Sequence, residues 1–135
     1  MKTTLKEAVR FHGHLGPYLI LGILAGEHAL KKLNCQKYFG LEVGVSGANK
    51  KPKSCLVDGL QLSTGATYGK GNIHKSAGSK IQIIFRALES KKSIKVLLKN
   101  NLIKKLKSLK NHQDSEAFAR KLAKIKPNNL FDLQA

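Results

Sequence analysis

The stretch that most constrains this chain is FHGHLGPYLIL, residues 11–21. His12 and His14 flank a glycine, and Pro17 stands directly before a long apolar run. Proline suits the first turn of a helix, because its fixed φ is helical and its missing N–H would have had no partner there. The pattern predicts two imidazoles in a tight turn at a helix N-terminus, where unpaired N–H groups and the helix dipole favour a metal, an anion or a reacting group.

The apolar run predicts a helix over residues 17–33. Its first half is apolar nearly all round, which indicates burial on most faces. Gly22 and Gly26 stand four residues apart on one face. This spacing lets another helix approach closely, so we expect tight packing there, for which a subunit interface is one candidate.

Length and composition indicate a single cytoplasmic domain, residues 1–135. An apolar content of 41% excludes general disorder, and the net charge of +17 favours acidic partners. Cys35 and Cys55 are too few for a disulfide framework, so reduced thiols are expected. The N-terminus is polar and unlike a secretion signal, and the apolar run is shorter than the ~20 residues that span a bilayer. We therefore expect no membrane contact.

Hydrophobic periodicity predicts an α+β fold, with helices packed on a small, mainly antiparallel sheet. The strands are expected over residues 39–46, 80–88 and 93–99, the last two forming a hairpin. The helices are expected over residues 3–10, 17–33, 55–62, 102–110 and 115–126. The core would then cover about residues 5–110, with a helical C-terminal part over 101–126. A single helix over 91–110 is the alternative to the second hairpin strand.

His12 and His14 are the first candidates for chemistry. In an extended segment, residues two apart point to the same side, so the two rings would form half of a metal site or a base with a neighbour. The alternative is a solvated turn in which one imidazole packs on Phe11.

Cys55 and Asp58 are the second candidates. Cys55 falls in the first turn of a predicted helix, where the dipole favours the thiolate, and Asp58 lies on the same face. An acid among apolar residues needs a partner, which could be His12 or His14, Lys70 or a metal. The alternatives are a buried inert thiol and an acid that stabilises its own helix.

The third candidate is the glycine-rich stretch TGATYGKGN, residues 64–72. Its glycines permit positive φ and close backbone approach, so the loop can present N–H groups to an anion, with Lys70 as a point charge. It lacks the spacing of a Walker A loop. A plain turn is the alternative.

The basic C-terminal third is the fourth candidate. Residues 91–126 hold twelve Lys or Arg and two acids. This favours either a solvated surface or nucleic acid, although an aromatic content of 6% gives little for bases to stack on.

The segments FHGHLGPYLILG and CLVDGLQLSTGATYGKGNI, in this order, resemble the FmdE family, the E-type component of formylmethanofuran dehydrogenase, over about residues 5–110. The resemblance implies an α+β domain that forms an intertwined homodimer. It also implies a pocket where the histidine turn, the Cys-x-x-Asp helix and the glycine loop meet, with a bound metal such as zinc. A role in one-carbon or molybdopterin-related metabolism would follow, whereas dehydrogenase activity of the isolated domain would not.

The chain departs from the family pattern at three positions. Family members typically carry cysteine after the histidines and in the glycine loop, and here these positions hold Gly16 and Ala66. Tyr18 stands at the final glycine of the histidine motif. A site rich in thiolates is therefore not expected.

These motifs together predict a pocket with three groups of residues. The expected ligands of zinc or another divalent metal are His12, His14 and Cys55. The expected catalytic residues are His14, Cys55 and Asp58. An anionic small molecule is expected to bind Gln61, Thr67, Gly69, Lys70, Gly71 and Asn72. A basic nucleic-acid-binding module and a catalytically silent scaffold are the alternatives.

Overall fold

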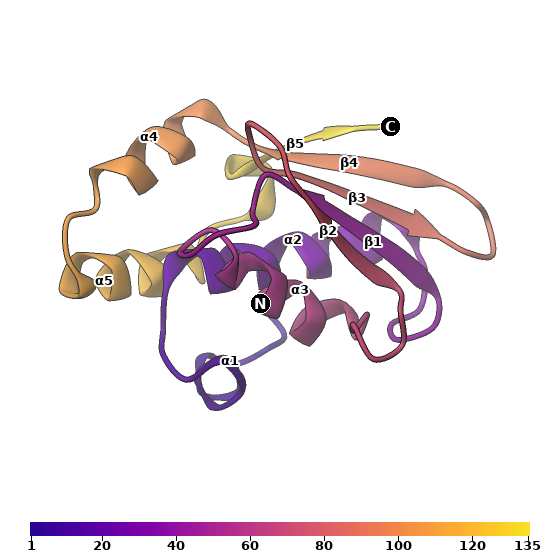
Figure 1. The fold of residues 1–135 in the computed structure, drawn as a ribbon, viewed down its shortest axis with the longest axis horizontal. Coiled ribbons are helices and arrows are strands. Elements are labelled where there is room, and N and C mark those ends of the chain that lie inside the picture. The colour runs from indigo at the N-terminus through magenta and orange to yellow at the C-terminus, as the bar shows by residue number, and fades with distance from the viewer.

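The computed structural model describes residues 1–135 and contains five α-helices and one five-stranded sheet (Figure 1). In chain order the elements are α1 (Leu5–His12), α2 (Pro17–Leu33), β1 (Leu41–Ser46), α3 (Cys55–Thr64), β2 (Ile73–Ser76), β3 (Gln82–Ala87), β4 (Ser93–Leu98), α4 (Asn100–Ser108), α5 (His112–Leu122), the 3₁₀ turn η1 (Pro127–Asn129) and β5 (Phe131–Gln134). The predicted α+β class is confirmed. None of these helices is long and apolar enough to cross a membrane.

The sheet has the strand order β2-β1-β3-β4-β5. β1 and β2 run parallel and are joined through α3, whereas every other neighbouring pair is antiparallel. The predicted hairpin exists as β3 and β4, so the alternative of one helix over residues 91–110 is wrong. β2 was not predicted, because Ile73 is its only buried residue and the other three are exposed, which leaves no alternation to detect.

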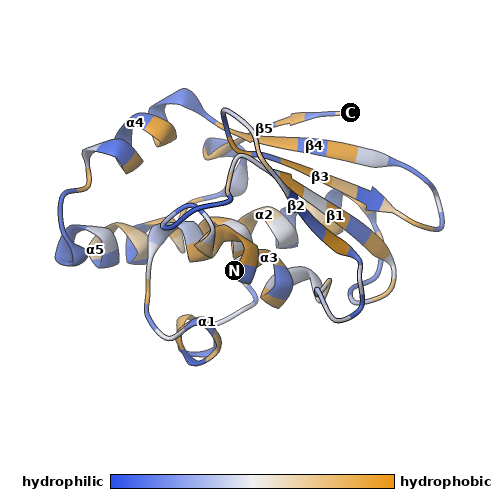
Figure 2. Cartoon of the chain, viewed as in Figure 1, coloured by the Kyte–Doolittle hydropathy of each residue, from blue (hydrophilic) through white to orange (hydrophobic).

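One face of the sheet forms the core. Val43 pairs with Phe85, and Val45 with Ile83, and all four side chains are buried. The helices lie on this side of the sheet (Figure 1), and the apolar residues in the middle of α2 and α3 stand out in Figure 2. Burial of this face is what fixes the strand register, because a shift by one residue would turn the apolar side chains to solvent.

α2 and α3 cross at very short range, and this crossing depends on glycine. A Cβ at Gly22 would collide with the carbonyl oxygen of Leu56, and one at Gly59 would collide with the carbonyl oxygen of Leu19. Gly26 faces the Ser63 side chain in the same way. The small-residue face of α2 is therefore covered within the chain, and the interpretation as a subunit interface is wrong for these two glycines.

The C-terminal part differs in detail from its prediction. α5 begins at His112 rather than near residue 115, because the Asn111 side chain accepts the N–H of Asp114 and caps the helix there. The final residues pack firmly: Phe131 is buried, and β5 pairs with β4 at the edge of the sheet. This pairing holds the chain end against the same sheet that carries the core.

Candidate metal site and adjoining cavity

The short helix α1 places the first histidine. A capping box fixes its start, because Glu7 N–H donates to Thr4 Oγ1 over 3.1 Å and the Glu7 carboxylate accepts the Thr4 N–H. Its end is fixed by Gly13, which has a φ of 105°, a left-handed value that glycine adopts readily. His12 is thus the last helical residue and His14 follows the reversal.

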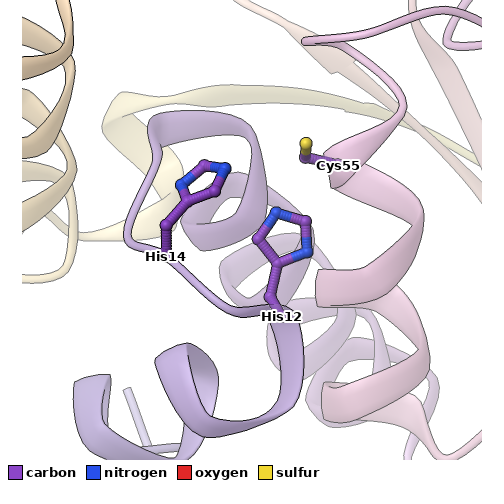
Figure 3. A group of neighbouring side chains, drawn as sticks. All are labelled: His12, His14 and Cys55. Atoms are coloured by element: carbon purple, nitrogen blue, oxygen red, sulfur yellow. The ribbon is translucent and has the colours of Figure 1, made fainter.

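The histidine rings meet although the segment is not extended as predicted. The turn at Gly13 brings the His12 and His14 ring centroids to 4.8 Å at an interplanar angle of 63°. Cys55, the first residue of α3, lies beside them (Figure 3). One donor atom from each of the three side chains lies within 4.8 Å of the others. Two segments that are far apart in the sequence thus form one cluster.

Asp58 has a definite partner. Its Oδ2 lies 2.6 Å from Nδ1 of His12, whose side chain is only 11% exposed. Nε2 of His12 is buried and contacts no hydrogen-bonding group of the protein. A carboxylate that accepts a hydrogen bond from Nδ1 keeps the proton there, so the lone pair is at Nε2. His12, rather than Lys70, is therefore the partner of Asp58.

The expectation that the helix dipole stabilises the Cys55 thiolate is wrong for the metal-free chain. Burial raises the pKa of the Cys55 thiol, and the neighbouring Asp58 carboxylate raises it further. Lys51 and a backbone hydrogen bond oppose this shift but do not overcome it. The Cys55 N–H already donates to the carbonyl of Pro52 over 3.2 Å, and Ser54 makes no capping bond. The thiol is therefore neutral unless a cation joins it.

The glycine-rich loop lies at the other end of α3 from Cys55. The helix has ten residues, which corresponds to about 15 Å. Lys70 Nζ donates to Thr67 Oγ1 over 3.2 Å and lies 5.5 Å from the Phe39 ring centroid. The Asn72 amide donates to the carbonyl of Tyr38 over 2.7 Å. These side chains hold the loop together and do not reach the histidines.

One hydrogen-bonded chain connects the loop with the cluster. The Gln61 Nε2 donates to Asp58 Oδ1 over 3.4 Å, and Gln61 Oε1 accepts the Tyr68 N–H over 3.2 Å. Both oxygens of Asp58 are thus engaged, one by His12 and one by Gln61. The loop therefore supports the orientation of His12 indirectly.

A cavity of about 710 Å³ opens beside the cluster. Its walls come from the start of α2, the loop before α3, and the junction of α4 with α5. It is lined by His14, Gly16, Pro17, Tyr18, Lys51, Pro52, Cys55, Leu106, Leu109, Lys110, Asn111, His112 and Ser115. No acidic residue is among them. The predicted residues in this wall are His14 and Cys55, while Gln61 and residues 67–72 are absent from it.

Sequence reasoning missed the cationic side of this cavity. Lys51 belongs to the Lys-Lys-Pro-Lys loop, which has the pattern of an ordinary exposed loop, and Lys110 belongs to a helix-flanking run typical of a solvated surface. Their positions opposite the histidines depend on tertiary packing. The clustering of lysine next to proline just before the Cys55 helix was the only available signal.

Gly16 and Ala66, the two departures from the family pattern, lie in different places. A Cβ at position 16 would stand 3.3 Å from Cε1 of His14, so this position adjoins the cluster. Ala66 is fully buried beyond the far end of α3. Within one chain, only the glycine at position 16 removes a potential ligand from this cluster.

The basic residues of the C-terminal third are dispersed over several environments. Lys110 lines the cavity, Lys105 lies 5.6 Å from the Phe118 ring centroid, and Lys99 pairs with Asp132 over 3.1 Å. Each therefore has a local contact that the charge count alone did not reveal.

The fold and the cluster define an α+β domain with a two-histidine, one-cysteine site beside an open cationic cavity. The family model described as FmdE, Molybdenum formylmethanofuran dehydrogenase operon, matches residues 11–132, and the chain belongs to this family. A probable S-adenosyl-L-methionine-binding protein of Archaeoglobus fulgidus is 34% identical over 70 residues. That match covers 51% of this chain but 19% of the relative.

Proposed function

We propose that this FmdE-family domain holds a divalent metal ion between His12, His14 and Cys55 and binds a small anionic molecule in the adjoining cavity. Zinc suits the donors best, because two imidazoles and one thiolate form a mixed nitrogen and sulfur set that zinc accepts readily. The family description supports a ligand from one-carbon or molybdopterin-related metabolism.

The observation that carries this proposal is the state of the His12 ring. Nδ1 is fixed by Asp58 at 2.6 Å, while Nε2 is buried with no partner. A buried polar atom without a hydrogen bond is costly, and proteins rarely keep one unless something occupies it. A carboxylate behind a ligating imidazole is a common arrangement in metal sites, where it fixes the ring and raises its basicity.

Three protein ligands would leave one coordination position open, facing the cavity. A zinc ion held in this way supplies a Lewis acid and lowers the pKa of water bound to it. His14 is exposed at the cavity wall and is placed to exchange a proton with a bound molecule. Asp58 acts through His12 and is a positioning residue, and Gln61 secures its second oxygen.

The relative from Archaeoglobus fulgidus makes S-adenosyl-L-methionine a ligand to test. Its sulfonium and amino groups are cationic, whereas the cavity has lysines and histidines in its wall and no acid. The charge of the cavity thus favours an anion over this cation. We therefore assign the cavity to an anionic molecule.

Metal analysis of protein purified without added metal tests the proposal. We expect about one zinc ion per chain in the native protein and in Cys35→Ser, because Cys35 lies outside the cluster. We expect metal to be lost from His12→Ala and from Cys55→Ser. Equal metal content in all four proteins, or none in the native one, would contradict the proposal.

A further inference from the structure

The cavity beside the cluster shows chemical features that identify a class of ligand. Its volume of about 710 Å³ lies within the range of small-molecule sites. Its wall combines Lys51, Lys110 and His112 with the apolar side chains of Leu106 and Leu109. A site of this kind recognises a charged group at one place and an apolar body at another.

The start of α2 adds to the positive character of this wall. Gly16 occupies the N-cap position and has no side chain to cap the helix. Pro17 has no N–H, and the N–H groups of Tyr18 and Leu19 donate no hydrogen bond within the chain. Free N–H groups at the first turn of a 17-residue helix attract anions.

We propose that this cavity binds an organic phosphate with an aromatic or apolar body, whose phosphate is held by Lys51 and Lys110. This deepens the proposed function, because it names the class of molecule that occupies the same site. The body would lie against Leu106, Leu109 and the half-buried Tyr18.

Phosphate fits this wall better than carboxylate. Arginine, with its planar fork, favours paired recognition of a carboxylate, and no arginine lines the cavity. Two lysines from separate segments act as point charges, and a dianionic phosphate gains more from them and from a helix N-terminus than a monoanion does. The nearest acid, Asp58, is engaged by His12 and Gln61 and does not line the cavity.

The other two candidate cavities lack this combination. One of about 380 Å³ shares Tyr18 and Leu106 with the first but includes the Asp132 carboxylate in its wall. The other includes Glu7 and Glu27. The cavity next to the histidines is therefore the one that suits a dianion.

Calorimetric titration of chelator-treated, metal-free protein with phenyl phosphate at low ionic strength tests this inference. We expect saturable binding at one site per chain. The double variant Lys51→Ala/Lys110→Ala should weaken it by at least about tenfold, since each lost charge-assisted hydrogen bond is worth about one or two powers of ten. The control Lys104→Ala/Lys121→Ala removes the same charge from outside the cavity and should change affinity by less than about twofold.

Three outcomes would overturn the inference. Equal weakening in the two double variants would reveal a general charge effect, and absence of saturable binding would exclude the site. Benzoate binding as tightly as phenyl phosphate would remove the phosphate preference, while equally tight inorganic phosphate would remove the apolar body. Because the titration uses metal-free protein, its result is independent of the zinc analysis that tests the proposed function.

Discussion

The carboxylate of Asp58 lies 2.6 Å from Nδ1 of His12 and so determines which nitrogen of that ring faces the cluster. The contact joins the end of α1 to the first turn of α3, two helices that are otherwise only lightly in touch. It makes the orientation of a metal ligand dependent on a residue 46 positions away. The same carboxylate also raises the pKa of the Cys55 thiol, so it acts on two of the three donors.

Asp58→Asn should weaken metal binding by about 10–100-fold, the usual loss when the carboxylate behind a ligating histidine is removed. The amide keeps the shape but carries no charge and holds the ring less firmly. Competition with a fluorescent zinc chelator measures the affinity. Asp132→Asn, which removes an acid at the sheet edge, should retain native affinity, and a similar loss in both variants would argue against a specific role for Asp58.

Gly16→Cys should convert the three-donor cluster into a four-donor site. A Cβ at this position stands 3.3 Å from the His14 ring, so a thiolate would lie next to the existing donors. Cobalt substitution gives the measurement, because thiolate-to-cobalt charge-transfer absorption should increase and zinc affinity should rise. Gly44→Cys places a thiol in open space on β1 and should give neither change. Unchanged absorption in Gly16→Cys would place position 16 outside the cluster.

Gly59→Ala should destabilise the fold by about 1–3 kcal/mol, the usual cost of inserting a methyl group into a tightly packed contact. The new Cβ would meet the carbonyl oxygen of Leu19, which is helix backbone and cannot turn aside. Urea denaturation measures the free energy of unfolding. Gly44→Ala, with nothing within 4 Å of its Cβ, is the matched control. Equal midpoints for the two variants would show that the α2–α3 crossing tolerates a wider separation.

His28 should make the stability of the protein depend on pH. Burial lowers the pKa of His28, and Lys32 and Lys31 lower it further. The unfolded chain, with a histidine pKa near about 6.5, then binds a proton that the folded chain resists. Stability is full above this value, falls as the pH drops towards the folded-state pKa, and is constant below it.

The measurement is the urea midpoint between about pH 7.5 and 5, the window in which histidines titrate. His28→Gln should lose less stability over this window than the native protein, because it lacks the group that resists protonation. His74→Gln, an exposed position on β2, serves as the control. Parallel curves for the native protein and His28→Gln would contradict the prediction.

Most of the fold was predictable because its signals are local. Pro17 begins α2, the alternation of Ile83 and Phe85 identifies β3, and Thr4 with Glu7 starts α1. β2 escaped prediction because it depends on pairing with β1 rather than on its own pattern. The start of α5 was misplaced because the capping role of Asn111 was overlooked.

The candidate site was predictable only in part. The meeting of His12, His14 and Cys55 was expected from motif spacing and family resemblance, and the structure brings these side chains together. The position of Lys70 was wrong because a glycine loop following α3 must lie at that helix's far end. The roles of Lys51 and Lys110 were invisible, because an exposed lysine acquires its neighbours only through tertiary packing.

The two sides of the cavity come from parts of the chain that are anchored separately. The cluster side belongs to residues 12–58, whereas Leu106, Lys110 and His112 belong to a segment attached to the body through buried Leu122 and the β4–β5 pairing. Substitutions in this second segment can change which molecule is admitted while the donors of the first remain intact. Ligand selectivity and metal affinity are therefore free to diverge independently among relatives that share this fold.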